Sequence, residues 1–90
     1  MVVKFLSLIR ELAGREKVQL QANNLEELIG KLSEKYGKKF EKRIWDAETK
    51  KLNDDIVILV NGKNLILLDG IKTILKEEDV VVIFPMAGGG

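Results

Sequence analysis

The stretch "NNLEELIGKLSEKYG" (residues 23–37) carries the clearest structural signal in the chain. Its apolar residues recur at the spacing of one helix face. These residues are Leu25, Leu28, Ile29, Leu32 and Tyr36. Asn24 suits the N-cap, with Glu27 placed as in a capping box, and Gly37 suits the C-terminal end. We therefore expect one main helix with a single buried face.

Two short strands are expected before this helix. The stretch "VVKFLSL" (2–8) is rich in β-branched and aromatic residues, as strands are. "IRELAG" (9–14) then indicates a helical turn that ends at its glycine. In "EKVQLQ" (16–21), Val18 and Leu20 alternate with polar residues, which indicates a half-buried strand.

A group of strands is expected after the helix. "IVILVNGKNLILLDG" (56–70) has two apolar runs around Asn61-Gly62, a pair that favours a tight hairpin turn. "VVVIFP" (80–85) is expected to be the last strand. Pro85 would end its hydrogen-bond ladder because proline has no N–H to donate.

Two strands, one long helix and a further group of strands follow the element order of the β-grasp (ubiquitin-like) fold. We expect an α+β protein of this class, in which a mixed sheet of four to five strands packs on one main helix. Residues 1–85 would form the β-grasp domain, and residues 86–90 a flexible C-terminal diglycine tail.

Residues 38–55 give a weaker signal. Phe40, Ile44 and Trp45 would anchor a short helix, and the polar remainder is expected to be a surface loop.

A single helix covers only one face of the sheet. In the last strand, Val81 and Ile83 would point to one face. Val80, Val82 and Phe84 would point to the other, where exposure costs ~25 cal/mol per Å² of apolar surface. Either the loop that carries Phe40 and Trp45 covers this second face, or a partner docks on it. The sequence leaves both alternatives open.

Composition excludes several functional classes. With a net charge of +1 over 90 residues, the chain lacks the electrostatic footprint of a protein that binds nucleic acid or anionic membranes. No apolar run approaches the ~20 residues of a transmembrane helix. The N-terminus carries Lys4 and Arg10 and lacks the pattern of a signal peptide. We therefore expect a cytoplasmic protein.

The side-chain inventory is equally restrictive. Histidine and cysteine are both absent, which removes the commonest general base, the thiol nucleophile and the usual zinc ligands. The acidic stretches at 53–55 and 77–79 are interpreted as surface turns rather than as a cation site. We therefore expect no bound metal and no self-contained catalysis.

The final stretch "IFPMAGGG" (83–90) suggests where the chemistry lies. Glycine lacks Cβ, so such a tail can thread a narrow channel. Fully extended, the residues after Pro85 reach roughly 17 Å. A free α-carboxylate is inert to nucleophiles and must be activated, for example as an acyl-adenylate. The chain has no Walker-type phosphate loop, so ATP chemistry would belong to a partner and this chain would be a substrate or carrier.

Three stretches carry a family resemblance: "FLSLIRELAG" (5–14), "LVNGKNLILLDG" (59–70) and "LKEEDVVVIFPMAGGG" (75–90). They resemble the MoaD/ThiS group of ubiquitin-like sulfur carriers, above all the small subunit of molybdopterin synthase and the archaeal ubiquitin-like small modifiers. In these families a pattern like Phe-Pro-Pro-Val-Ala-Gly-Gly closes the chain. Phe84 to Gly90 keep its spacing, with Met86 in place of the second proline.

The resemblance implies a carrier that binds no cofactor itself. A ubiquitin-activating-enzyme-like (MoeB-like) adenylyltransferase would use ATP to adenylate the carboxylate of Gly90, and a sulfurtransferase would convert it to a thiocarboxylate. The large subunit of molybdopterin synthase (MoaE-like) would then receive the tail for molybdenum cofactor biosynthesis. Gly88 and Gly89 would thread the channel. By position, the residues expected to dock partners are Phe5, Leu6, Arg10, Leu65, Phe84 and Pro85.

Other functions remain open. Within the resemblance, the tail would instead form isopeptide bonds to lysines of other proteins, or supply sulfur for tRNA thiolation. Thiazole delivery is less favoured, because chains of that type usually lack an insertion like 38–55. A β-grasp interaction module with no tail chemistry is a remote alternative.

Overall fold

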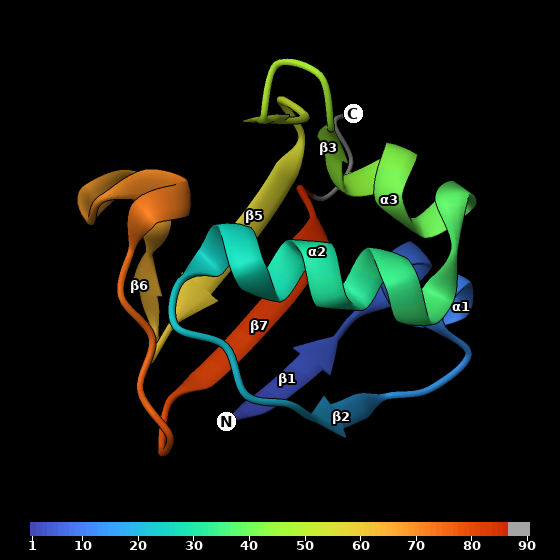
Figure 1. Ribbon diagram of the computed structural model, residues 1–90. Coiled ribbons are helices and arrows are strands. Elements are labelled where there is room, and N and C mark those ends of the chain that lie inside the picture. Colours follow the sequence, from blue (N-terminus) through green and yellow to red (C-terminus); the bar gives the residue numbers. More distant parts are fainter. Residues whose placement is uncertain (87–90) are drawn as a thin grey trace.

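A five-stranded mixed sheet forms one layer of the domain (Figure 1). The computed structural model describes residues 1–86. The strands, in spatial order, are β2 (Lys17–Gln19), β1 (Val2–Phe5), β7 (Val80–Pro85), β5 (Ile56–Val60) and β6 (Lys63–Asn64). β1 and β7 run parallel at the centre, and the other pairs are antiparallel. The order β2-β1-β7-β5-β6 around one helix is the predicted β-grasp fold, which is therefore confirmed.

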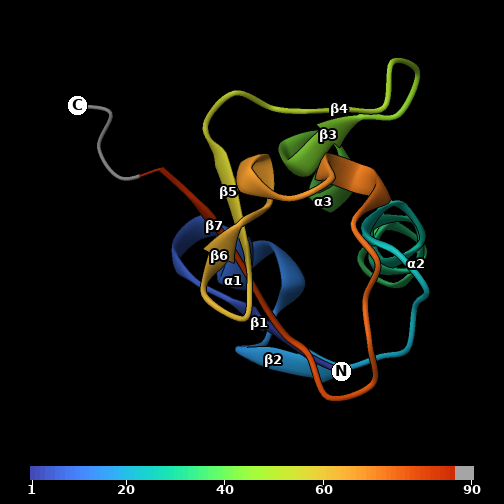
Figure 2. The same ribbon diagram turned by 90° about the vertical axis from the view of Figure 1, so that its left-hand side faces the viewer.

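The predicted main helix is α2 (Leu25–Tyr36). Its N-cap is Asn24, whose side chain accepts a hydrogen bond from the Glu27 N–H at 2.8 Å. Gly37 follows with a positive φ of 94°, a conformation that glycine adopts without strain. α2 lies across one side of the strands (Figure 2) and buries its apolar stripe against them. Local signals alone thus identified this helix and both of its ends.

The first connection is more helical than the sequence indicated. β1 stops at Phe5, and α1 (Ser7–Ala13) begins soon after, where a strand over 2–8 was predicted. The reason is a turn in the backbone, since Ser7 has a φ of 56°. α1 ends at Gly14, as predicted.

The predicted hairpin turn at Asn61-Gly62 is confirmed, but its second arm is short. After β6 the chain enters two 3₁₀ turns, η1 (Leu65–Leu67) and η2 (Gly70–Lys72). Leu65 is buried whereas Leu67 is 80% exposed, so this apolar run does not continue as a strand of the sheet.

The last strand ends at Pro85, as predicted, with one further hydrogen bond beyond its last pair. Pro85 lies opposite Ile56, and the N–H of Met86 still donates to the carbonyl of Asp55. Successive strand residues direct their N–H groups to opposite sides, so the nitrogen of Pro85 faces the side of β1. β1 has already ended at Phe5, so the missing N–H costs no ladder bond there.

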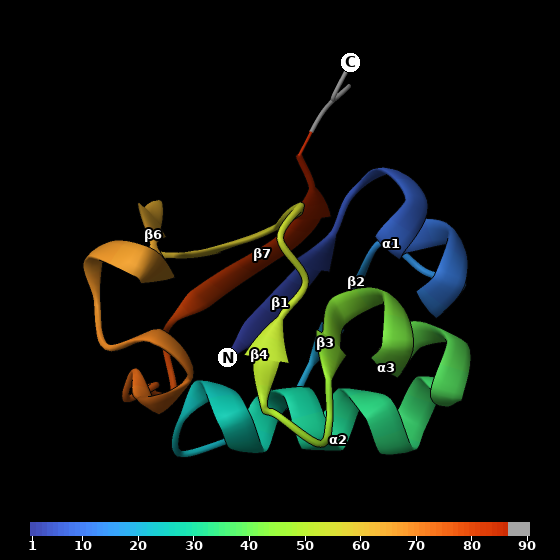
Figure 3. The same ribbon diagram turned by 90° about the horizontal axis from the view of Figure 1, so that it is seen from above.

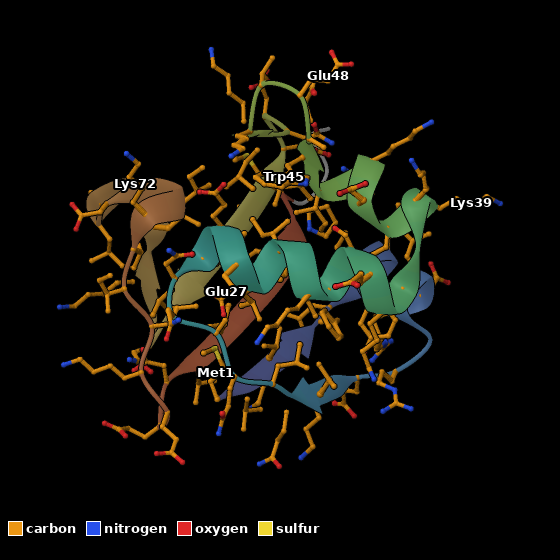
Figure 4. All side chains as sticks on the ribbon, viewed as in Figure 1. Met1, Glu27, Lys39, Trp45, Glu48 and Lys72 are labelled. Carbon is orange, nitrogen blue, oxygen red and sulfur yellow. The ribbon has the colours of Figure 1, made fainter. Side chains whose placement is uncertain are left out.

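Residues 38–55 pack on the helix side of the sheet. α3 (Lys38–Ile44) is the predicted short helix, and a two-stranded hairpin of β3 (Trp45–Asp46) and β4 (Lys51–Leu52) replaces the expected loop. The ring of Phe40 lies 5.8 Å from that of Phe5 in the core. Seen from above, α2, α3 and this hairpin share one side of the strands (Figure 3). Trp45 is buried, while Lys39 and Glu48 extend outward (Figure 4). Residues 38–55 therefore do not cover the second face.

Candidate functional site

The second face of the sheet presents half-buried apolar side chains. We call them the open face: Val57, Leu59, Val80, Val82 and Phe84. Their neighbours Val81 and Ile83 point into the core and are fully buried, as the alternation in the sequence predicted. Val57 lies opposite Phe84, and Leu59 opposite Val82, so the side chains form rows across β5 and β7. Rows of apolar side chains on the surface of a sheet are typical of interaction sites, so the open face is the candidate docking surface.

Cations border the open face. Lys4 of β1 lies beside Val82, and Lys17 of β2 lies opposite Lys4. Both lysines are exposed. The positive charges of Lys4 and Lys17 repel each other because they lie opposite one another. An anionic group of a binding partner would relieve this repulsion, so the border of the open face favours acidic partners.

Four of the residues predicted to dock partners lie at the surface. Leu6 is 43% exposed and donates its N–H to the Ile83 carbonyl at 3.2 Å, which places it at the end of β7. Arg10 is exposed on α1. Phe84 and Pro85 are half-buried at the end of β7. Their contact with a partner stays a prediction.

The other two predicted docking residues require correction. Phe5 is 0% exposed and packs edge-on against Tyr36 and Phe40, with ring centroids 5.7 Å and 5.8 Å away. Leu65 is 4% exposed in the same core. Both side chains are therefore core residues that a partner of the folded domain does not touch. Phe5 faces inward because it pairs with Ile83, a register that the sequence alone does not reveal.

The predicted reactive group lies beyond the described residues. Gly88, Gly89 and Gly90 fall outside the range 1–86. The structure does describe the root of the tail at Met86, which is 59% exposed and bound through its N–H to Asp55. This root continues directly from Phe84 and Pro85, so the tail begins at the edge of the open face.

A two-point ion pair lies next to the tail root. Arg43 donates to both carboxylate oxygens of Asp55, at 3.0 Å and 2.7 Å. The hydrogen bond from Arg43 holds the pKa of Asp55 below its ordinary value, and the same bond raises the pKa of Arg43. Sequence reasoning missed this pair, because partners twelve residues apart have no local signature. The signal that was available is the basic last turn of α3, which contains Arg43, together with the acidic turn at residues 53–55.

Two kinds of functional feature, a metal site and a membrane-spanning helix, are absent from residues 1–86. Among residues 1–86, no group of acidic side chains is arranged to hold a metal ion. The same residues include no helix long and apolar enough to cross a membrane. The features that residues 1–86 present are the open face, as a candidate docking surface, and the start of the tail at Met86.

Comparisons with known proteins agree with this geometry. The model of the ThiS family matches residues 3–90. Small archaeal modifier protein 3 of Haloferax volcanii is 26% identical over 91 residues, which cover 98% of this chain and 96% of that protein. The solution structure of small archaeal modifier protein 1 from Methanosarcina acetivorans is 30% identical with a TM-score of 0.84, covering 99% and 94% of the two chains.

A further solved structure supports the fold alone. A chain in the crystal structure of the Amycolatopsis orientalis BexX/CysO complex matches with a TM-score of 0.87 at 21% identity, covering 99% of this chain and 98% of that one. The resemblance to ubiquitin-like sulfur carriers and modifiers, read first from three stretches of sequence, is confirmed by the match over residues 3–90. The chain belongs to the ThiS family.

Proposed function

We propose that this protein is a sulfur carrier whose reactive group is the carboxylate of Gly90. The observation that carries the proposal is the extent of the family match, which runs through residue 90 and so includes the glycine tail. The side-chain inventory supports it, because a chain without histidine or cysteine lacks the usual groups for chemistry of its own. Catalysis would lie in partner enzymes.

Activation takes two steps, which are adenylation of the carboxylate and transfer of sulfur to its carbonyl carbon. An oxygen of the Gly90 carboxylate attacks the α-phosphorus of ATP and displaces pyrophosphate, which gives an acyl-adenylate. A sulfur nucleophile held by a sulfurtransferase then attacks the carbonyl carbon, and AMP leaves with the oxygen that bound it. One C–O bond breaks and one C–S bond forms. If the sulfur arrives as a persulfide, a thiol of the sulfurtransferase system reduces the resulting acyl disulfide to the thiocarboxylate.

The open face would dock the adenylating enzyme. Val57 and Phe84 form the row nearest the tail root, so a partner seated there lies close to the start of the tail. Burying apolar surface contributes about 25 cal/mol per Å², and the lysines at the border favour acidic groups on the partner. This arrangement separates recognition on the sheet from chemistry at the end of the chain.

At finer detail, we propose that the thiocarboxylate serves molybdopterin synthase, with this chain as its small subunit. The support is the tail pattern from Phe84 to Gly90, which keeps the spacing of that family. A large subunit would receive the tail, and its active site would pass the sulfur to the molybdopterin precursor.

A second candidate is a protein modifier that forms isopeptide bonds to lysines. The observation that favours it is that two of the relatives described above, at 26% and 30% identity, are small archaeal modifier proteins. Both candidates need the same adenylate, and they differ only in the nucleophile that attacks it.

Mass spectrometry distinguishes these outcomes. The purified protein, with Gly90 as its last residue, is incubated with ATP, an adenylating enzyme of the ubiquitin-activating type and a sulfur donor. Replacement of one oxygen by sulfur at Gly90 supports the carrier, and transfer of that sulfur with a large synthase subunit supports the finer role. A Gly90–lysine linkage supports the modifier. A variant lacking Gly90 is the control, and equal product from this variant contradicts the proposal.

A further inference from the structure

We infer that residues 38–55 hold the root of the tail, through contacts that run from Arg43 through Asp55 to Met86. We call these three residues the tail clamp. The inference rests on the proposed function, since the direction of the tail matters only if the tail enters a partner's active site.

The first link is a backbone contact at the end of the sheet. The Met86 N–H donates to the Asp55 carbonyl, one step beyond the pairing of Pro85 with Ile56. Asp55 and Met86 are both exposed, so little packing holds them together. A backbone bond at an exposed strand end opens readily unless something else fixes one of its partners.

The second link fixes Asp55. Arg43 contacts both oxygens of its carboxylate, at 3.0 Å and 2.7 Å, and a two-point contact restricts orientation as well as distance. The side chain of Arg43 is about half as exposed as that of Asp55, at 26% against 50%. Arg43 is therefore the better anchored partner.

The third link connects the turn that contains Asn53 and Asp55 to α3. The side chain of Asn53 donates to the carbonyls of Lys42 and Arg43 at 2.8 Å and 2.9 Å. The N–H of Asn53 donates to the Ile44 carbonyl at 2.9 Å. α3 is itself anchored in the core by fully buried side chains, Phe40 and Ile44. Asp55 is thus connected to a rigid element rather than to a free loop.

The tail clamp lies next to the open face. Asp55 stands two residues before Val57 on β5, and Met86 stands two residues after Phe84 on β7. A partner docked on the Val57–Phe84 row therefore meets the tail at a fixed point. Fixing the start of a segment that must enter an active site lowers the ordering cost of binding. We assign Arg43 and Asp55 as positioning residues for tail activation.

The clamp is tested first without any partner. In ¹⁵N-labelled protein, solvent exchange of the Met86 amide is measured by NMR for the wild type, Arg43→Gln and Asp55→Asn. We expect exchange at Met86 to rise by about fivefold in both variants, the factor for losing one ordinary hydrogen bond. Core amides of β7 should be unchanged. Lys50→Gln is the matched control, because it breaks the 2.7 Å contact of Lys50 with Glu26 in the same segment.

Rescue separates the pair from the individual residues. Arg43→Asp combined with Asp55→Arg restores an ion pair of reversed polarity and should return Met86 exchange toward the wild-type rate. Unchanged Met86 exchange in both Arg43→Gln and Asp55→Asn, with both variants folded, overturns the inference.

The functional arm uses the adenylating enzyme with ATP and follows pyrophosphate release. Arg43→Gln should lower kcat by about fivefold or more and leave the KM for the carrier unchanged, because the open face still docks. Normal kinetics despite faster Met86 exchange would overturn the positioning role. A wild-type protein that is never adenylated overturns the proposed function instead, while the exchange result still stands.

Discussion

Asn61 and Asp79 join the turn after β5 to the start of β7, with Asn61 Nδ2 donating to Asp79 Oδ1 at 2.9 Å. The other oxygen of Asp79 accepts from the Lys76 N–H at 2.8 Å. Asn61 Oδ1 in turn accepts from the Val80 N–H at 3.0 Å. Asp79 is 9% exposed, and its two carboxylate oxygens each accept one of these hydrogen bonds. The contact secures the end of the sheet opposite the tail root.

Replacing Asp79 should destabilise the fold. In Asp79→Ala the side chain of Asn61 and the N–H of Lys76 lose their acceptors, which costs about 1–3 kcal/mol of unfolding free energy. Urea denaturation at neutral pH measures the loss. Asp54→Ala, at an exposed position, is the control and should change little.

This stabilisation should depend on pH in a defined direction. Two hydrogen bonds lower the pKa of Asp79 in the folded protein. The larger effect comes from the side chain of Asn61, and the smaller from the backbone N–H of Lys76. The contribution of Asp79 is therefore full above the unfolded pKa of about 4 and declines as pH falls toward the lower folded value. The difference in unfolding free energy between the wild type and Asp79→Ala should shrink on acidification through this range. A difference that grows as pH falls would contradict the assignment.

Phe5 should behave as a core residue and not as a docking residue. Phe5→Ala removes a fully buried ring and should cost about 3–5 kcal/mol in urea denaturation. Phe5→Leu keeps most of the apolar volume, so partner affinity should be retained wherever that variant folds. A folded Phe5→Leu protein with strongly reduced affinity would reinstate Phe5 as a contact.

Phe84 should behave in the opposite way. Phe84→Ala removes part of the open face and should weaken binding of the adenylating enzyme by about tenfold, within the range found for interface anchors. Its unfolding free energy should fall less than that of Phe5→Ala, because Phe84 is only half-buried. Titration calorimetry measures the affinity. Leu67→Ala, at an apolar position outside the open face, is the matched control.

The cap of α2 supplies an independent test of the fold. Asn24→Ala removes the acceptor for the Glu27 N–H and should cost about 1 kcal/mol. Asn23→Ala is a neighbouring control, because its side chain makes only a 3.4 Å contact with Glu27. Equal losses in the two variants would argue against the cap.

What the sequence predicted well was local. α2 was identified with both ends because its apolar spacing, its cap and Gly37 all lie within one short stretch. The two faces of β7 followed from alternation alone. The fold class followed from the order of these elements.

What it missed depends on distant partners. The inward orientation of Phe5 is set by its register against Ile83, far along the chain. The two-residue strands β3 and β4 are too short for any periodicity. Arg43 and Asp55 meet only because α3 packs beside the start of β5. Such contacts follow from tertiary structure and leave no pattern in neighbouring residues.

The parallel pairing of β1 with β7 has a consequence for synthesis. β7 lies between β1 and β5, so the sheet cannot close until residues 80–85 have left the ribosome. A nascent chain that stops earlier lacks its central strand and leaves its apolar residues open to proteases. The sheet is thus completed only after the strand that leads into the tail root has been made.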